Sequence, residues 1–438
     1  MSSLFRRVTD RVHRMIILVL LLTNVLFAIK ESHAELLKPG RLPVVDYQID
    51  AVINSHEKVI SAKQKVSFTN PTANPTDELY FHLYANRHYT PREKSFMMRY
   101  AGYFKADPFP EGFPIDPVKI VSISLDGKPL AFSVNGDDKT ILKVSLPKPL
   151  AGGEPVTIEM NYTVCIPKAY GRFGWHNNIF ALSRWYPILA VYTDEGWSNY
   201  PFYPFHRPFF ADAALYKVRL RVANNQVVVH TGDLVRETSE GSDKILEIET
   251  PLPVREFTMA MSPDYRVVEG KHNITTVKAY YLPGREKRGR EALDTALQLM
   301  DFYSEKFGDY PYKTFSIAPV TLGYGGEQMS NLVFIDSRVY DLPRFLQRYF
   351  SFLIAHETGH QWFYNILGID SYKEIWMEEG FNSYFLLEFL ENKYGKNAGV
   401  IDLSRLPEWL KPHVPNLPFR KTTGVRYKMI ARQGLDHP

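Results

Sequence analysis

The sequence predicts a multidomain protein in which an N-terminal antiparallel β domain precedes an α+β domain. Two patterns carry this prediction. Apolar and polar residues alternate over much of residues 44–268, whereas apolar residues recur at helical spacing in several segments of residues 269–438. The chain has 438 residues, of which 45% are hydrophobic and 14% aromatic. This length and composition suit two or three domains with sizeable cores and are unlike those of a disordered chain.

Alternation with a period of two defines the first half. Tyr216, Val218, Leu220 and Val222 fall on one face of an expected strand, and the residues between them are all basic. The same alternation recurs in two earlier segments, residues 47–53 and 60–68. Turn-forming residues such as those at 127–129 and 152–153 separate the runs. Many short strands joined by turns predict an antiparallel sandwich or extended sheet domain.

The second half alternates strands with helices. Apolar spacing and glycine stops predict, in chain order, a strand at 276–281, a helix at 288–307, strands at 315–320 and 332–335, a helix at 343–367 and a helix from about 378. Gly308 and Gly368 follow the first two helices as expected stop signals. We therefore place the domain boundary between residues 268 and 269.

A metal-binding pattern lies in the second of these helices. His356, Glu357 and His360 form an H-E-x-x-H motif, and Glu379 follows after eighteen intervening residues. Two histidines four residues apart lie on one face of a helix, so both imidazoles can reach one metal ion. Glu357 projects about 100° around the helix from His356, which suits a general base for metal-activated water. Two histidines and a glutamate leave the fourth position of zinc open, as a catalytic site requires.

Charge and cysteine content narrow the other possibilities. The net charge is +4, from 52 basic and 48 acidic residues, and gives no reason to expect nucleic-acid binding. Cys165 is the only cysteine, so the chain can form no intrachain disulfide.

The N-terminus has the pattern of an export signal. Four arginines precede a mostly apolar run at 15–29, and Ser32-His33-Ala34 offers small residues for cleavage before Glu35. We expect residues 1–34 to be a secretory signal peptide and the mature protein to be exported or to lie in the cell envelope. An uncleaved membrane anchor is the alternative, and only then would the protein contact a membrane.

Two sequence segments resemble those of a known family. His356 to Phe363 spells HETGHQWF and Trp376 to Tyr384 spells WMEEGFNSY. Together with their spacing, they are similar to the M1 family of zinc metallopeptidases, the relatives of aminopeptidase N and leukotriene A4 hydrolase. The resemblance implies a saddle-like β domain followed by a thermolysin-like catalytic domain. It also implies one zinc ion held by His356, His360 and Glu379, with Glu357 as the general base. The implied substrates are peptides, and the reaction most expected of this family is removal of their N-terminal residues, as by an aminopeptidase.

The substrate-binding segment departs from the family pattern. The family's Gly-x-Met-Glu-Asn signature aligns with Gly325 onward, so that Gly326, Glu327 and Gln328 lie along the substrate. The family glutamate that pairs with the substrate ammonium group is replaced here by Gln328, which carries no charge. Either Glu327 takes over this role through a local bulge or selectivity for free N-termini is weakened. Glu378, next to the third ligand, is interpreted as an outer-shell or solvated acid.

The family also places an oxyanion-stabilising tyrosine some way beyond the third ligand. Tyr427 is the only late tyrosine, and its neighbours differ from those of the family residue. We therefore expect that tyrosine and the family's helical C-terminal domain to be missing from this chain, which leaves the catalytic domain at 269–438 incomplete at its C-terminus. The principal hypothesis is a zinc peptidase. The alternative is an exported zinc-binding or peptide-binding protein with a vestigial, inactive peptidase domain.

Overall fold

The computed structural model describes residues 45–421 except 88–89, 93, 96–97, 99–106, 113, 137–138, 201–208 and 417. The expected signal peptide at residues 1–34 and the late Tyr427 lie outside the described residues. Within the described ranges, no helix combines the length and the hydropathy that a membrane crossing requires.

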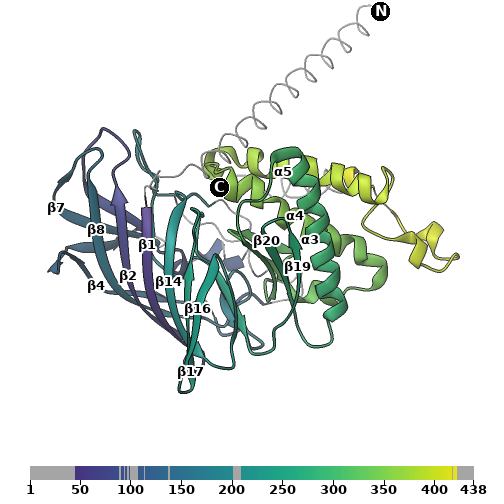
Figure 1. Ribbon diagram of the computed structural model, residues 1–438, viewed down its shortest axis with the longest axis horizontal. Helices are drawn as coiled ribbons and strands as arrows, with labels where there is room; N and C mark the ends of the chain where they lie inside the picture. Colours follow the sequence, from purple (N-terminus) through teal and green to yellow (C-terminus); the bar gives the residue numbers. More distant parts are fainter. Residues whose placement is uncertain are drawn as a thin grey trace, which may run out of the picture.

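A large eight-stranded sheet forms the first half of the molecule (Figure 1). Its strands, in spatial order, are β16 (Asp233–Glu240), β17 (Asp243–Glu249), β14 (Ala214–Ala223), β1 (Val45–Asn54), β2 (Val59–Thr69), β8 (Pro155–Cys165), β4 (Val118–Leu125) and β5 (Lys128–Pro129). The three alternating segments of the sequence are β1, β2 and β14, and their apolar residues face the core as expected.

One pairing in this sheet differs from the antiparallel arrangement that we predicted. β1 and β14 run parallel, with Val45 opposite Ala214 and Val52 opposite Arg221. A parallel pair needs a long connection between its strands, and residues 55–213 provide one. Sequence alternation reports which face of a strand is buried but not the direction of its neighbour, so this pair could not be foreseen.

Smaller sheets complete the β region. One four-stranded sheet has the order β15 (Val227–His230), β18 (Met259–Ser262), β10 (Ile179–Leu182) and β9 (Phe173–His176). Another has the order β11 (Ile188–Leu189), β3 (Thr76–His82), β7 (Ile141–Leu150) and β6 (Phe132–Asn135). The pair β12 (Tyr192–Thr193) and β13 (Gly196–Trp197) and the short helix η1 (Tyr84–Asn86) lie beside them.

The second half is built on a mixed five-stranded sheet. Its order is β19 (Arg266–His272), β20 (Thr275–Tyr281), β21 (Thr314–Val320), β23 (Leu332–Asp336) and β22 (Gly326–Met329), which places β22 at an edge. β19 starts before the boundary that we placed between residues 268 and 269, so that boundary falls inside this strand.

Both faces of this sheet are buried. On β21, Phe315 and Ile317 belong to the main core on the helix side, whereas Ala318 and Val320 pack in a second cluster with residues of β10, β15 and β18. Burial on both faces explains why β21 and β23 read as continuous apolar runs rather than as alternating ones. The second cluster also packs the five-stranded sheet against the β region.

Three long helices lie on the other face of the five-stranded sheet (Figure 1). They are α3 (Glu286–Phe307), α4 (Gln347–Gly359) and α5 (Ser371–Tyr394). A π-helical segment, η4 (Gln361–Ile366), follows α4, and short 3₁₀ turns complete the chain: η2 (Ser337–Asp341), η3 (Arg344–Leu346), η5 (Leu403–Arg405) and η6 (Lys411–His413).

The helix boundaries differ from prediction near the metal motif. The helix expected at 343–367 is divided into η3, α4 and η4, and Phe363 inside η4 has non-helical angles of φ −99° and ψ 49°. The helix expected from about 378 begins at Ser371, where the Asp370 side chain accepts a hydrogen bond from the Tyr372 amide. The apolar pattern continues through all of these segments, so periodicity alone did not reveal the breaks.

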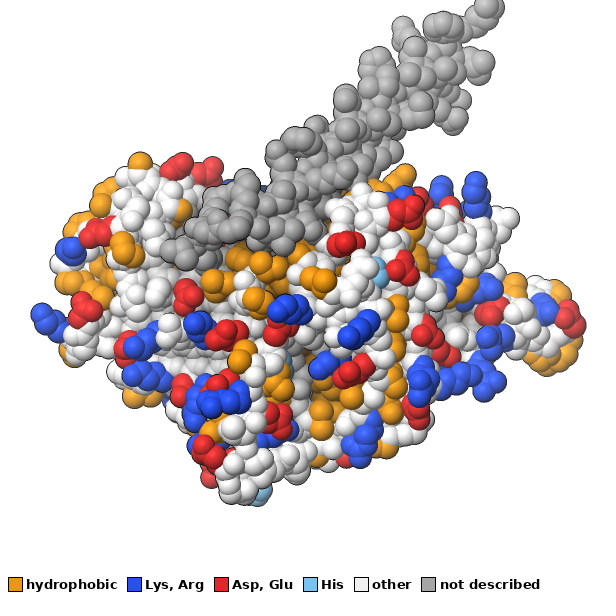
Figure 2. Space-filling model, in the orientation of Figure 1, with side chains coloured by type: hydrophobic (Ala, Val, Ile, Leu, Met, Phe, Trp, Pro, Cys, Tyr) orange, Lys and Arg blue, Asp and Glu red, His pale blue; other side chains and the backbone are white. Residues whose placement is uncertain are grey.

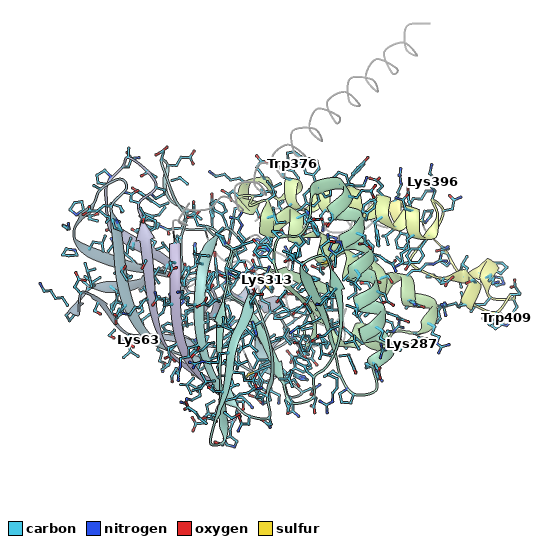
Figure 3. All side chains as sticks on the ribbon, viewed as in Figure 1. Lys63, Lys287, Lys313, Trp376, Lys396 and Trp409 are labelled. Carbon is cyan, nitrogen blue, oxygen red and sulfur yellow. The ribbon has the colours of Figure 1, made fainter. Side chains whose placement is uncertain are left out.

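The surface fits the balanced charge of the sequence. In the view of Figure 2, acidic and basic side chains are interspersed, without a continuous face of one sign. Figure 3 shows Trp409 at the tip of the segment that follows α5, where its side chain is 73% exposed.

Candidate metal centre

His356 and His360 converge because the chain stays locally helical through both residues. His356 lies in the last turn of α4, and His360 caps that helix with φ −64° and ψ −10°, inside the right-handed helical region. The i, i+4 spacing therefore holds although regular α-helix ends at Gly359. The two Nε2 atoms lie 3.4 Å apart, with the rings nearly perpendicular.

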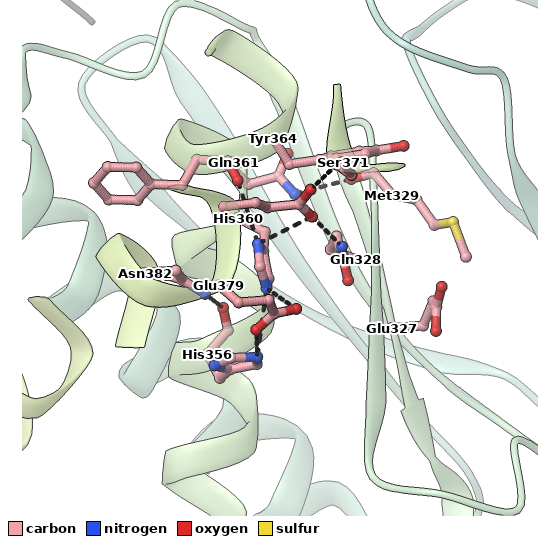
Figure 4. A network of polar contacts seen from close by, with 12 residues as sticks. Glu327, Gln328, Met329, His356, His360, Gln361, Tyr364, Ser371, Glu379 and Asn382 are labelled. Atoms are coloured by element: carbon pink, nitrogen blue, oxygen red, sulfur yellow. Dashed lines mark hydrogen bonds and ion pairs between the residues drawn. The ribbon is translucent and has the colours of Figure 1, made fainter. Parts of the chain in front are cut away.

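Glu379 reaches the same point from α5. Its carboxylate oxygens lie 3.5 Å from His356 Nε2 and 3.7 Å from His360 Nε2 (Figure 4). Two ligand atoms that are each about 2.0–2.1 Å from a tetrahedral metal ion lie roughly 3.3–3.4 Å apart. The three side chains thus have the donor types and nearly the spacing that a zinc ion requires, and small side-chain adjustments would complete the fit.

Burial and hydrogen bonding prepare His360 as a neutral ligand. His360 is fully buried, and this burial is the main cause that lowers the pKa of its imidazole, against the opposing charge of Glu379. Its Nδ1 lies 3.4 Å from the Phe363 carbonyl oxygen, which suits an Nδ1–H donor. That tautomer leaves the Nε2 lone pair directed toward the His356 and Glu379 side chains, as metal ligation needs.

Glu357 is held beside these ligands by strand β22. Its side chain is only 2% exposed, and a ligand atom of Glu357 lies within 4.8 Å of those of His356 and His360. Gly326 of β22 lies against this side chain, because a Cβ atom added there would lie 2.6 Å from Glu357 Cγ and 2.7 Å from its Oε1. Glycine at position 326 therefore lets the strand backbone lie directly against the candidate base.

The neighbouring residues of β22 face opposite sides of the sheet. Glu327 forms a buried ion pair with Arg172, at 2.6 Å, and accepts a hydrogen bond from the Tyr324 hydroxyl at 3.0 Å. Gln328 faces the metal side instead. β22 pairs with β23 in regular register from Gly326 to Met329, so no bulge brings Glu327 to the side of Gln328. This geometry disfavours the expectation that Glu327 replaces the family's substrate-binding glutamate.

Glu378 belongs to the site more closely than the sequence indicated. It is 4% exposed, accepts a hydrogen bond from Gln328 Nε2 at 2.8 Å and another from the Ser371 hydroxyl, and lies 3.7 Å from His360 Nδ1 (Figure 4). Burial, with the adjacent charge of Glu379, raises the pKa of Glu378 to about 8. The sequence did contain one indication of this role. Glu378 directly precedes the expected ligand Glu379 within the helical segment WMEEGFNSY, which places it near the metal ligands.

The hairpin between β22 and β23 is tied to the metal helix through Gln361. This buried residue donates from Nε2 to the Met329 carbonyl at 2.9 Å, and its Oε1 accepts from the Asn331 amide at 3.0 Å and from the Tyr310 hydroxyl at 2.9 Å. Gln361 directly follows His360 and begins the π-helical segment. Its hydrogen bonds therefore connect the backbone next to the second histidine to the hairpin that contains β22.

Comparison with known proteins identifies this region. Residues 291–410, which contain all four motif residues, match the family model for the peptidase family M1 domain. We refer to this matching segment below as the M1 domain.

Several proteins that are similar to this chain are named aminopeptidases. The chain is 25% identical to aminopeptidase N of Acetobacter pasteurianus over 39% of this chain and 51% of that protein. It is 24% identical to puromycin-sensitive aminopeptidase of Caenorhabditis elegans, over 46% of this chain and 22% of that protein. A leucyl aminopeptidase of Saccharolobus solfataricus is 25% identical, over 39% and 23% of the two chains. The matched stretch thus spans about half or less of these relatives.

A solved structure supports the fold around the M1 domain. The M1 zinc metallopeptidase of Deinococcus radiodurans superposes with a TM-score of 0.52, covering 81% of this chain and 72% of that one at 16% identity. This likeness confirms the predicted order of a strand-rich domain followed by an α+β domain.

Proposed function

We propose that the protein is a zinc-dependent peptidase that removes N-terminal residues from peptides. The observation that carries this proposal is the convergence of His356, His360 and Glu379 within 3.4–3.7 Å of one another, with Glu357 buried alongside. A bound zinc ion would supply Lewis acidity, which polarises a carbonyl and makes water more acidic. The aminopeptidase names of the relatives support the reaction class.

Glu357 would act as the proton carrier. Its carboxylate would accept a proton from the attacking water and later donate that proton to the leaving amine. The contact with Gly326 limits where this carboxylate can lie. A general base must lie within hydrogen-bond reach of the proton that it moves. We therefore propose that the contact with Gly326 helps to hold the Glu357 carboxylate in its working position.

β22 would position the substrate backbone. Among the described strands only β23 pairs with β22, so the other edge of β22 can accept an extended peptide as an added strand. Gln328 uses its amide nitrogen to hold Glu378 and would present its amide oxygen to the substrate amine. A neutral acceptor makes weaker bonds to an ammonium group than a carboxylate does. We therefore propose a modest rather than strict preference for free N-termini.

The N-terminal segment supports a proposal about location. The basic, apolar and small-residue regions of residues 1–34 suit export, and the substrates would then be peptides outside the cytoplasm or in the cell envelope.

The Glu357→Gln variant tests the proposal. We expect the purified wild-type chain to contain one zinc ion by metal analysis and to cleave aminoacyl amides. Glu357→Gln should keep the zinc and lose about 10²–10⁴-fold in kcat, the usual contribution of general base catalysis. The matched control is Glu374→Gln on α5, which replaces an exposed acid and should leave both properties unchanged. Wild-type turnover by Glu357→Gln would refute the assigned role.

The neutral Gln328 gives the binding-protein alternative its one supporting observation. A wild-type chain that binds zinc but cleaves neither aminoacyl amides nor longer peptides would favour this alternative over the peptidase.

A further inference from the structure

The two helices that carry the metal ligands are both irregular next to those ligands. In α5, Glu374 has non-helical angles of φ −132° and ψ 42°, five residues before Glu379. After α4, Phe363 breaks regular geometry three residues beyond His360. Regular helix therefore does not by itself fix the distance from Glu379 to the two histidines, and other contacts must set it.

Asn382 makes such a contact between the two helices. It lies one turn after Glu379 on α5 and is fully buried. Its Nδ2 donates to the backbone carbonyl of His356 at 2.9 Å (Figure 4). Its Oδ1 accepts from the Tyr303 hydroxyl of α3 at 3.3 Å. One amide thus joins three helices and bonds directly to the backbone of a candidate ligand.

Gly359 provides the space that Asn382 occupies. A Cβ atom added at Gly359 would lie 2.1 Å from Asn382 Oδ1 and 3.0 Å from the Tyr303 hydroxyl. No real Cβ atom tolerates such a separation, so any other residue at position 359 would displace the amide. Gly359 lies inside the H-E-x-x-H motif, where the sequence pattern itself leaves the residue unspecified.

We propose that Gly359 and Asn382 form one positioning unit that sets the spacing between Glu379 and the two histidines. The Asn382 amide locks the turn of α5 that carries Glu379 onto the backbone of His356, and Gly359 allows α5 to approach that closely. Asn382 touches no substrate or reacting atom, so its effect passes through the ligands. This inference rests on the metal site of the proposed function.

Metal affinity of the purified full chain is the property that this unit controls. We expect Asn382→Ala, and the isosteric Asn382→Asp, which lacks the N–H donor, to weaken zinc binding by about 10–100-fold, the usual effect of losing a residue that orients a ligand. Competition with a chromophoric chelator measures this affinity without substrate. The absorption spectrum of the Co²⁺-loaded protein should shift in the same variants, because the ligand geometry changes.

Two comparisons separate positioning from general stability. Asn70 is a matched control, since it too is buried and donates to backbone carbonyls, those of Asn74 and Leu150, but lies in the β region. Asn70→Ala should lower the unfolding temperature and leave zinc affinity unchanged. Gly359→Ala should weaken zinc binding about as much as Asn382→Ala. In the Asn382→Ala background the same change should cost less than about threefold, because the amide that the methyl group would displace is already absent.

Three results would overturn the inference. The first is wild-type zinc affinity in both Asn382 variants, and the second is an equal loss of affinity in Asn70→Ala. The third is a Gly359→Ala effect that is the same with and without Asn382. The proposed function fails separately, because a wild-type chain that binds zinc but cleaves no peptide refutes peptidase activity while the affinity comparison stands.

Discussion

The large eight-stranded sheet and the region around the metal ligands place their charged side chains in opposite ways. In the eight-stranded sheet, charges lie on the solvent face as cross-strand pairs, such as Lys63 with Glu159 at 2.9 Å and Arg219 with Asp50 at 3.3 Å. In the M1 domain, Glu327, Glu357 and Glu378 are each less than 5% exposed. Burying carboxylates costs free energy that folding alone does not recover. The comparison teaches that the large sheet is arranged for stability and the region around the metal ligands for chemistry.

The largest expected effect is a loss of stability caused by a substitution in the large sheet, and it tests whether that sheet contributes to stability rather than to catalysis. Leu220 of β14 is fully buried on the core-facing side of the large sheet. Leu220→Ala should lower the free energy of unfolding by about 2–5 kcal/mol, because it removes apolar contacts and leaves a cavity. Urea unfolding measures this loss, and kcat per folded molecule should not change. The neighbouring Arg219→Ala should cost less than about 1 kcal/mol, as exposed ion pairs usually do. Loss of catalysis in folded Leu220→Ala would break the comparison.

The next expected effect is a loss of catalytic rate caused by a substitution in the M1 domain. Gly326→Ala would press a methyl group against Glu357, whose Cγ lies 2.6 Å from the added Cβ position. We expect about a 10²-fold loss in kcat, since misplacing a catalytic group by about 1 Å costs that much. Steady-state cleavage of aminoacyl amides measures it.

The matched glycine variant is Gly380→Ala, which has nothing within 4 Å of its added Cβ. Alanine in the middle of α5 should keep activity and stabilise the helix by up to about 1 kcal/mol. Equal activities of Gly326→Ala and Gly380→Ala would show that the contact with Glu357 does not matter.

The smallest effect concerns the bond between Gln328 and Glu378. Gln328→Glu would place two carboxyl groups where a 2.8 Å hydrogen bond now lies. The pKa of Glu378 is already raised to about 8 by burial and Glu379. At pH 6 the pair can share a proton that the unfolded chain does not hold. A second carboxyl group should raise the pKa of Glu378 further, so that the folded variant still holds the proton at a pH where wild type has released it. Because the unfolded chain holds no such proton, the stability of Gln328→Glu relative to wild type should fall by about 1–3 kcal/mol between pH 6 and 9.

The swapped double variant provides the control. Gln328→Glu with Glu378→Gln restores one donor and one acceptor, and its stability relative to wild type should depend little on pH. Unfolding of chelator-treated protein at pH 6 and pH 9 measures both variants. A single variant whose relative stability does not change with pH would contradict the expected pairing of the two carboxyl groups.

The sequence predicted the β region and the metal ligands for different reasons. Alternation identified the buried faces of β1, β2 and β14 because each of these strands has one solvated side. The H-E-x-x-H spacing predicted that His356 and His360 meet because local helical geometry alone brings them together. Both predictions depend on contacts within one element or on one face of it.

What could not be predicted depends on contacts between distant elements. The parallel pairing of β1 with β14 joins segments more than a hundred residues apart. The breaks that divide the helix expected at 343–367 leave the apolar pattern intact, so nothing local marks them. Nothing in the sequence around Glu378 shows that its carboxylate bonds to Gln328, which comes from β22. In each case the deciding partner comes from another part of the chain.

The hairpin between β22 and β23 has a consequence for how this chain can vary. Ser330 donates from its amide to Glu256, its carbonyl accepts from the Thr231 hydroxyl, and its hydroxyl accepts from the Arg255 amide. Gln361 holds the residues on either side of Ser330. An inserted residue here would break contacts with the β region and the metal helix at once. Evolution can therefore alter the chemistry of this hairpin by substitution, whereas its length is fixed by the architecture that surrounds it.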